Sequence, residues 1–285
     1  MNAYKNIGKM LKSDANASII SEELVNLHSK VLDYLGNYKQ TPLISKVPNK
    51  EYFSFDSGTK KSRAVNKALF TANMQPIESV IQSISSKNFT NITAEEITSA
   101  LYSMAVGFCS VIDLTKTGDQ KTPGTFFEYF VCNWVSKMLG INPRKQVDVL
   151  NLDMSTSLPT DYIFDLGTNQ PKIHLPVKTS TRERVIQVWA HQRVLDGVYG
   201  TGRFLGILVS LSETKVDQNS LEVVEICLPE QWQIYQMFIA QMKRIYYLDL
   251  PSKYRDLRNV FPPIPVYSFG EFFLEYQNKT LLSRD

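Results

Sequence analysis

The sequence contains few residues that could crosslink the chain or form a soft-metal cage. Its 285 residues include three cysteines and three histidines. The cysteines are odd in number, far apart and never arranged as a CxxC pair: Cys109, Cys132 and Cys227. This pattern argues against a disulfide framework and against a zinc cluster. The histidines are equally scattered, so we expect no histidine-based metal site.

Long hydrophobic runs and a strong charge bias are also missing. The chain has no run of about 18 apolar residues that would indicate a membrane span. It begins with the polar residues Met-Asn-Ala-Tyr-Lys-Asn, which do not resemble a signal peptide. We therefore expect a cytoplasmic protein that does not bind membranes. A net charge of +3 excludes a histone-like protein, while 43% hydrophobic and 21% charged residues are typical of a globular protein.

Residues 1–120 are predicted to form a mainly helical N-terminal region. Apolar residues recur at helical spacing from Ser21 to Leu35, and Gly36 offers a stop. Thr93-Ala-Glu-Glu96 is a capping-box pattern in front of an apolar helix that should run to about Leu114. Residues 39–61 contain two prolines, a glycine and several lysines, and are predicted to be a loop.

Residues 121–285 mix helical and strand patterns. A helix is expected from Thr125 to near Gly140. Further strands are predicted at 146–152, 161–166, 172–178, 204–211 and 221–228, and further helices at 182–195 and 230–246. This order predicts an α/β fold with a central mixed sheet flanked by helices. The tail after Pro251 is rich in proline and aromatic residues and is expected to pack on the core.

An acidic residue and a lysine stand at the ends of two successive predicted strands. Asp161 opens one strand, Lys178 closes the next, and the chain turns between Gly167 and Pro171. If these strands pair as a hairpin, the two side chains meet at the same end of the sheet. A carboxylate there can hold Mg²⁺, and an ammonium group beside it can orient an attacking water or stabilise a pentavalent phosphorus. The alternative is an ordinary exposed aspartate and lysine at two strand ends.

Lys178 is followed directly by Thr-Ser-Thr-Arg-Glu-Arg. A guanidinium group such as that of Arg182 or Arg184 can donate two hydrogen bonds to guanine O6 and N7. A carboxylate such as that of Glu183 can accept a hydrogen bond from cytosine N4. Glu183 also completes a capping-box pattern with Ser180, so a structural role at a helix start is open beside the base-reading role.

These residues together resemble the PD-(D/E)xK nuclease superfamily. Pro159-Thr-Asp161 matches the first half of its motif, and Pro176-Val-Lys178 matches the second. More narrowly, the segment resembles type II restriction endonucleases that cut CCGG-, CCNGG- and CCWGG-type sites. Those enzymes carry an Arg-(Asp/Glu)-Arg triplet shortly after the catalytic lysine. The resemblance therefore implies base recognition by three residues: Arg182, Glu183 and Arg184.

A glutamate upstream extends the resemblance. Glu128 lies 33 residues before Asp161 on a predicted helix, close to the interval in the family. By resemblance, Asp161, Lys178 and Glu128 are catalytic, and Mg²⁺ is held by Asp161, Glu128 and the carbonyl group of Val177. The alternative for Glu128 is a helix cap, because Thr125-x-x-Glu128 also matches a capping box.

Two positions depart from the family pattern. Pro176 stands where the superfamily usually has an acid two residues before the lysine. CCGG-type enzymes instead take an acid from the following helix, at positions that His191 and Gln192 occupy in this chain. The second carboxylate is therefore unassigned, with three candidates: Asp165, Asp196 and Glu183.

The resemblance implies a Mg²⁺-dependent endonuclease that cuts both strands of duplex DNA at a short palindromic site with adjacent G·C pairs. Such an enzyme is expected to act as a homodimer, because a palindromic site mirrors two-fold protein symmetry. Residues 121–285 would form the nuclease core, and residues 1–120 would provide dimer contacts or contacts to outer base pairs. Two other classes remain open: a structure-directed nuclease of repair or recombination, and a DNA-binding protein without catalytic activity.

Overall fold

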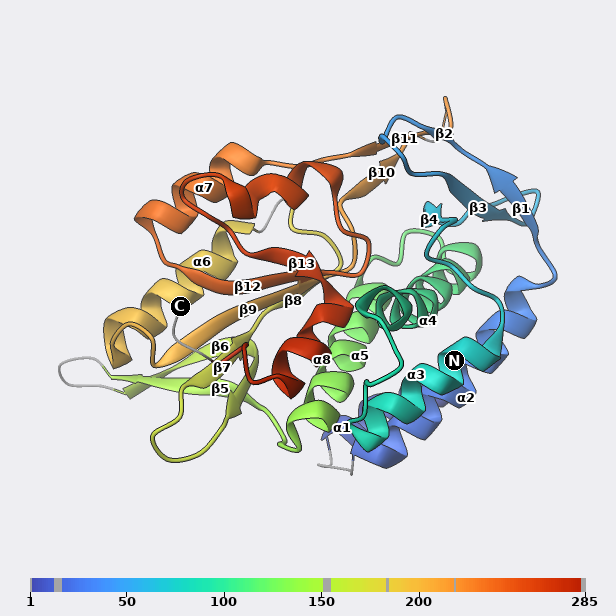
Figure 1. Cartoon of the computed structure of the whole chain (residues 1–285). Coiled ribbons are helices and arrows are strands. Elements are labelled where there is room, and N and C mark those ends of the chain that lie inside the picture. The colour runs from blue at the N-terminus through green and yellow to red at the C-terminus, as the bar shows by residue number, and fades with distance from the viewer. Residues whose placement is uncertain (1, 13–16, 151–154, 183–184, 218, 283–285) are drawn as a thin grey trace.

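A seven-stranded mixed sheet forms the centre of the molecule (Figure 1). The computed structural model describes residues 2–12, 17–150, 155–182, 185–217 and 219–282. The strand order is β13-β12-β9-β7-β6-β5, and β8 pairs with β9 beyond the end of β7. The bounds are β5 (Arg144–Leu150), β6 (Ser155–Asp165), β7 (Lys172–Leu175), β8 (Val177–Lys178), β9 (Phe204–Ser210), β12 (Met242–Tyr247) and β13 (Val266–Ser268).

The sheet is antiparallel at one edge and parallel elsewhere. Strands β5, β6 and β7 are antiparallel neighbours, whereas β7, β9, β12 and β13 run parallel to one another. The predicted α/β fold with a central mixed sheet is thus confirmed. Parallel strands need crossover connections, and the helices that supply them cover the faces of the sheet.

Alternating side chains of the central strands divide the core into two layers. On β9, Ile207 and Val209 pack into the large cluster on the side of α4 and α5, whereas Leu208 packs into a second cluster with Trp189 and Trp232. The first side holds α1 (Asn2–Lys12), α2 (Ala17–Leu35), α3 (Met74–Ser86), α4 (Ala94–Thr115), α5 (Lys121–Leu139) and α8 (Phe269–Gln277). The second side holds α6 (Val185–Tyr199), α7 (Pro229–Phe238) and the short 3-10 helix η1 (Ser252–Asn259).

Helix α4 is the apolar centre of the first layer. Its predicted capping box is present, because Thr93 Oγ1 accepts from the Glu96 backbone and Glu96 accepts from the Thr93 backbone. Its length and composition alone would allow a membrane span, but 83% of its apolar window is buried inside the protein. It is therefore a core helix. The large cluster combines residues from both predicted parts of the chain, for example Leu101 and Tyr162.

The prediction of a loop at residues 39–61 was wrong. This segment forms β1 (Lys39–Pro42), β2 (Ile44–Ser45) and β3 (Tyr52–Asp56). Two small sheets result, β1-β3-β4 and β10-β11-β2, with β4 (Val65–Asn66), β10 (Thr214–Val216) and β11 (Glu222–Glu225). The physical reason is burial: the aromatic residues of β3 pack into the core, while the two prolines are exposed.

A buried ionic network fastens these small sheets to the end of β12. Lys50 Nζ lies 2.7 Å from Asp249 Oδ1 and 2.8 Å from Glu225 Oε1. The Tyr52 hydroxyl group and the Asn66 amide also donate to Asp249, which is 2% exposed. A buried carboxylate needs such partners, because an unpaired buried charge is strongly destabilising. The network therefore links the N-terminal segment to the central sheet.

The predicted helix at 230–246 was wrong in its second half. Helix α7 ends at Phe238, and the chain re-enters the sheet as β12 from Met242. Ile245 and Tyr246 are both fully buried although they point to opposite faces. A strand buried on both faces reads as a continuous apolar run, which periodicity alone cannot distinguish from a buried helix.

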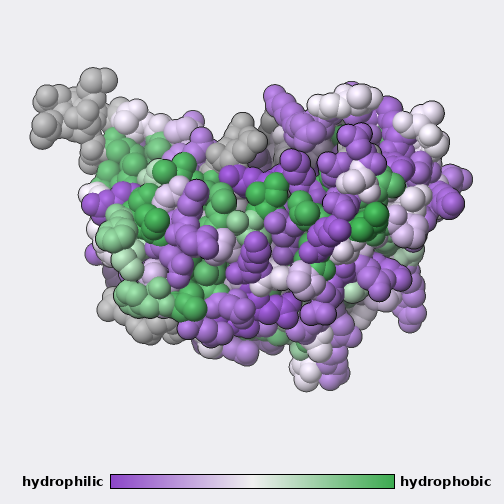
Figure 2. Space-filling view, turned by 90° about the horizontal axis from the view of Figure 1, so that it is seen from above, coloured by the Kyte–Doolittle hydropathy of each residue, from purple (hydrophilic) through white to green (hydrophobic). Residues whose placement is uncertain are grey.

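Exposed hydrophobic residues gather on the side of α6 and α7. Seen from above, that side of the molecule carries much of the hydrophobic surface, whereas the side of β2 and β11 is mostly hydrophilic (Figure 2). Phe238, at the end of α7, is 75% exposed, and Phe261, in the loop before β13, is 83% exposed. Contiguous exposed apolar surface is typical of protein contact surfaces.

Replacing Gly270 by alanine should destabilise the fold severely. A Cβ atom at Gly270 would lie 1.9 Å from the Ala94 carbonyl oxygen, where α8 crosses the start of α4. Because the clash is with backbone, we expect a loss of about 3 kcal/mol or more in the free energy of unfolding, measured by urea denaturation. Gly197→Ala is the matched control: it meets nothing within 4 Å in α6 and should stabilise the protein by about 0.5–1 kcal/mol. Equal effects of the two changes would contradict this packing.

His28 should make the protein sensitive to mild acid. It is buried between α2 and α4, and neither ring nitrogen has a hydrogen-bond partner within the described residues. Burial lowers its pKa from 6.5 to about 4. Between these values the unfolded state binds more protons, so stability falls as the pH is lowered from 6.5 toward about 4.

We expect His28→Leu to remove about 2 kcal/mol of this loss, measured as the difference in unfolding free energy between about pH 7 and about pH 5. His174 is buried with a similar pKa of about 4, so part of the pH dependence should persist. An unchanged pH dependence in His28→Leu would show that His28 does not contribute.

Candidate active site

The hairpin of β6 and β7 brings Asp161 and Lys178 together as predicted. The strands pair antiparallel from Tyr162↔Leu175 to Asp165↔Lys172, and the chain then passes through Pro176 into β8. Lys178 Nζ lies 2.5 Å from Asp161 Oδ2. Because the ladder with β6 ends at Leu175, the backbone N–H of Val177 is available to the same oxygen and donates to it over 2.8 Å. Two donors therefore fix the Asp161 carboxylate where the ladder between β6 and β7 ends. Asp161 lies within β6, which begins at Ser155, so the prediction that it opens the strand was wrong.

Glu128 approaches the same site from α5. Burial raises the pKa of the Glu128 carboxyl, and the nearby charge of Asp161 raises it further, while Lys178 and Lys145 oppose the shift. These interactions place Asp161, Lys178 and Lys145 within electrostatic reach of Glu128. The capping alternative does not hold, because α5 begins at Lys121, so that Glu128 lies inside the helix and Thr125 is not its N-cap.

The oxygen atoms at this site suit a hard divalent cation. Mg²⁺ in proteins typically binds one or two carboxylates and keeps several water molecules. Asp161 and Glu128 supply such a pair. Both observed donors to Asp161 bind Oδ2, which leaves Oδ1 for another ligand. Across the described ranges there is no group of three or more His, Cys, Asp or Glu side chains that could hold a metal, so a site here would rely on two carboxylates, backbone and water.

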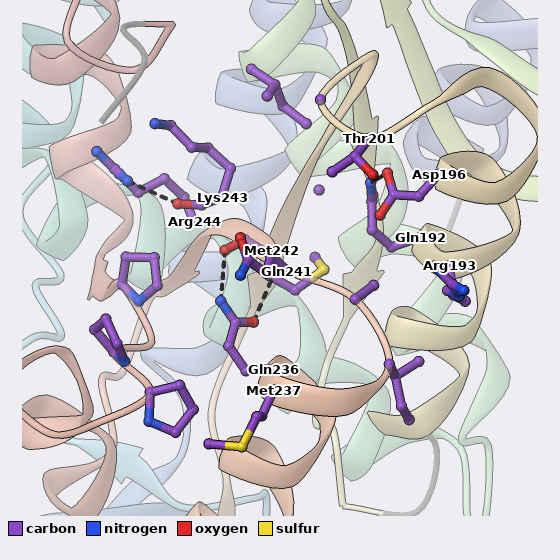
Figure 3. A pocket seen from close by; sticks show the side chains of 18 of the residues that line it. Gln192, Arg193, Asp196, Thr201, Gln236, Met237, Gln241, Met242, Lys243 and Arg244 are labelled. Atoms are coloured by element: carbon purple, nitrogen blue, oxygen red, sulfur yellow. Dashed lines mark hydrogen bonds between the residues drawn. The ribbon is translucent and has the colours of Figure 1, made fainter.

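Two candidates for the second carboxylate lie away from Asp161. Asp165 is four residues further along β6, about 13 Å away at 3.3 Å per residue, and pairs with Lys172 over 2.6 Å. Asp196 lies beside Gln192 and Thr201 in a cavity of about 870 Å³ at the amino end of β9 (Figure 3). The candidate site is at the carboxyl end of β9, next to Ser210. Glu183, the third candidate, lies outside the described residues.

Gln192 has a structural role at the position where the family carries an acid. It forms a 3.0 Å hydrogen bond with His174 Nδ1, and its amide donates to Asp196 and to the Phe204 carbonyl. Burial lowers the pKa of His174 to about 4, so this ring is neutral at physiological pH. The partly exposed His191 ring lies 6.4 Å from that of His174, centroid to centroid. These contacts dock α6 on the sheet.

The segment after Lys178 is held by a residue that the sequence did not indicate. Glu213, just beyond β9, accepts hydrogen bonds from Ser180 and Thr181, and Ser180 Oγ accepts from Arg182 Nε over 2.9 Å. Arg182 lies four residues after Lys178 and three residues before Val185, where α6 begins. Glu183 and Arg184 are outside the described residues, so their predicted roles stay predictions. Nothing in the sequence around Glu213 distinguishes it from a solvent-exposed acid after a strand.

Comparison with solved structures identifies the fold. The crystal structure of the type IIP restriction endonuclease Kpn2I matches this chain with a TM-score of 0.83 and 22% sequence identity, covering 99% of this chain and 98% of that one. The chain has the fold of a type II restriction endonuclease. A complex of the restriction endonuclease PspGI with substrate DNA is 13% identical over 72% of this chain and 92% of that one, with a TM-score of 0.42. No protein-family model and no curated protein matches this sequence.

A divalent cation should stabilise the protein through Asp161. A ligand that binds only the folded state raises the melting temperature, here by about 2–5 °C at millimolar Mg²⁺ or Mn²⁺. We expect Asp161→Asn to abolish this shift in differential scanning fluorimetry. Asp165→Asn is the matched control on the same strand and should retain it, because Asp165 pairs with Lys172 at the far end of the hairpin. A shift that survives in Asp161→Asn would place the cation elsewhere.

Proposed function

We propose that this protein is a Mg²⁺-dependent, site-specific endonuclease that hydrolyses both strands of duplex DNA. The observation that carries the proposal is the Asp161–Lys178 pair, 2.5 Å apart at one end of the sheet, with Arg182 four residues beyond the lysine. The fold shared with Kpn2I supports it. The recognition site would be short and palindromic with adjacent G·C pairs.

Each residue of the site has a distinct part in this reaction. Asp161, Glu128 and the Val177 carbonyl would hold Mg²⁺, which neutralises phosphate charge and lowers the pKa of bound water. Asp161 also holds the Lys178 ammonium group in place through a direct ion pair. From there Lys178 can orient the attacking water and stabilise charge on the pentavalent phosphorus. Partial burial lowers the effective dielectric constant around Glu128, which strengthens its interaction with a cation.

The segment from Arg182 onward would read the bases. Arg182 and Arg184 would donate to guanine edges and Glu183 would accept from cytosine, as the sequence resemblance implies. A palindromic site calls for two copies related by a two-fold axis, so the active form would be a homodimer in the cytoplasm. Residues 1–120 would provide dimer contacts or contacts to the outer base pairs.

Cleavage of phage or plasmid DNA tests the proposal directly. In Mg²⁺ the wild type should produce discrete fragments, and sequencing their ends should reveal a G·C-containing palindrome. Asp161→Ala and Lys178→Ala should each lower the cleavage rate by a factor of about 10³ or more, since each removes a group that acts on the reacting phosphate.

The same hairpin provides the control. Asp165 and Lys172 form an equivalent ion pair, 2.6 Å apart, at its other end. Asp165→Ala and Lys172→Ala should therefore cleave at near wild-type rates. A smear in place of discrete bands would indicate a structure-directed nuclease, and intact DNA with both Mg²⁺ and Mn²⁺ would leave a DNA-binding protein without catalytic activity.

A further inference from the structure

A buried carboxylate lies directly beneath the segment that leads from Lys178 to Arg182. Glu213 is 1% exposed. Its Oε2 accepts from Ser180 Oγ over 2.7 Å, and its Oε1 accepts from the Thr181 backbone N–H over 2.9 Å and from Thr181 Oγ1 over 2.7 Å. Both residues of the segment are thus bound to one side chain that lies more than thirty positions later in the chain.

The position of Glu213 follows from the pairing of β8 with β9. Lys178 is opposite Ser210, and the pairing continues outward because the Ser212 N–H donates to the Thr179 carbonyl over 3.3 Å. The residues that follow on each strand, Ser180 and Glu213, are therefore neighbours. The register of the sheet brings the carboxylate under the segment.

Hydrogen bonds rather than a cation compensate the charge of Glu213. Within the described part of the chain it forms no ion pair, and burial raises the pKa of its carboxyl while the bonds from Ser180 and Thr181 oppose that shift. The fourth donor group is the Tyr247 hydroxyl, 2.8 Å from Oε1. Tyr247, the last residue of β12, is itself fully buried against the rings of Trp232 and Tyr254, so this contact rests on the packed core.

The chain of contacts ends at Arg182. Ser180 donates its hydroxyl hydrogen to Glu213 and accepts from Arg182 Nε over 2.9 Å. Accepting from Arg182 while donating to a carboxylate strengthens both bonds, because consecutive hydrogen bonds polarise one another. With Nε engaged by Ser180, the two Nη atoms are the pair that can donate to a base edge.

We propose that Glu213 is a positioning residue for base recognition: through Ser180 it holds the Arg182 side chain in the orientation that reads guanine. The inference rests on the proposed function, and it adds a residue that does not itself contact DNA. Its role differs from that of Asp161 and Lys178, because Glu213 acts on the discrimination between sites rather than on the hydrolytic step.

Substitutions can interrupt this series of hydrogen bonds without creating a cavity in the core. Glu213→Gln keeps an oxygen for Thr181 and Tyr247 but turns an NH₂ group toward Ser180, which then receives two donors and holds Arg182 less firmly. Ser180→Ala removes the acceptor of Arg182 altogether, and Ser180→Thr restores a hydroxyl. Tyr246→Phe is the structural control, because Tyr246 donates to Glu275 on the other face of the same strand.

Two measurements on these variants test the proposal. The first is hydrogen exchange of the Arg182 Nε–H in the free protein, observed by NMR with ¹⁵N-labelled arginine and assigned through Arg182→Lys. The second is the ratio of kcat/KM at the mapped site to kcat/KM at a site with one G·C pair replaced. Ser180→Ala and Glu213→Gln should accelerate exchange and lower the ratio, each by at least about tenfold. Ser180→Thr and Tyr246→Phe should resemble the wild type.

The two measurements separate failure of this inference from failure of the proposed function. Unchanged exchange in both Glu213→Gln and Ser180→Ala would overturn the positioning role, whatever the activity. Faster exchange with an unchanged ratio would overturn the link to base recognition. If the wild type cut no discrete site, the proposed function would fail and the base-reading role of Glu213 with it, while the exchange data would still decide whether Glu213 holds Arg182.

Discussion

The parallel pairing of β8 with β9 is the constraint on which the candidate site depends. It sets Lys178 against Ser210 at the carboxyl end of the sheet, while the hairpin with β6 brings Asp161 to the same point. Because the chain pairs with β9 after Pro176, the ladder between β6 and β7 ends at Leu175. The Val177 N–H is then free to donate to Asp161. Strand pairing, rather than any loop conformation, thus places an acid, an ammonium group and the segment before α6 at one edge. A site built on paired strands is held more accurately than one built on loops.

Much of this arrangement could be predicted from local patterns. The turn between Gly167 and Pro171 and the two apolar runs beside it indicated the hairpin, and hence the meeting of Asp161 with Lys178. The helices α2 and α5 followed from apolar periodicity, and α5 ends at Gly140, which adopts a positive φ of 74° as a helix stop requires. Each of these signals comes from residues that are close together in the chain, so it can be recognised in a single sequence.

The features that were missed depend on contacts between distant segments. Residues 242–247 form a strand because both faces are covered by the core, not because their local pattern excludes a helix. The strands of residues 39–56 exist because Tyr52 and its neighbours pack under a network centred on Asp249, about two hundred positions away. Glu213 acquires its partners only through the register of β8 and β9. No spacing within the sequence encodes such partners.

The buried network of Lys50, Asp249 and Glu225 has a consequence for how the chain can be divided. Asp249 and Glu225 belong to the C-terminal half, whereas their cation comes from the N-terminal segment. A fragment that began after α4 would leave both carboxylates without Lys50 and strip the Tyr52 and Asn66 donors from Asp249. In such a fragment water would have to solvate these two carboxylates in place of the lost partners. The packing at the end of β12 would then be weakened. Truncation at that point would therefore disturb the carboxyl edge of the sheet, where Asp161 and Lys178 lie.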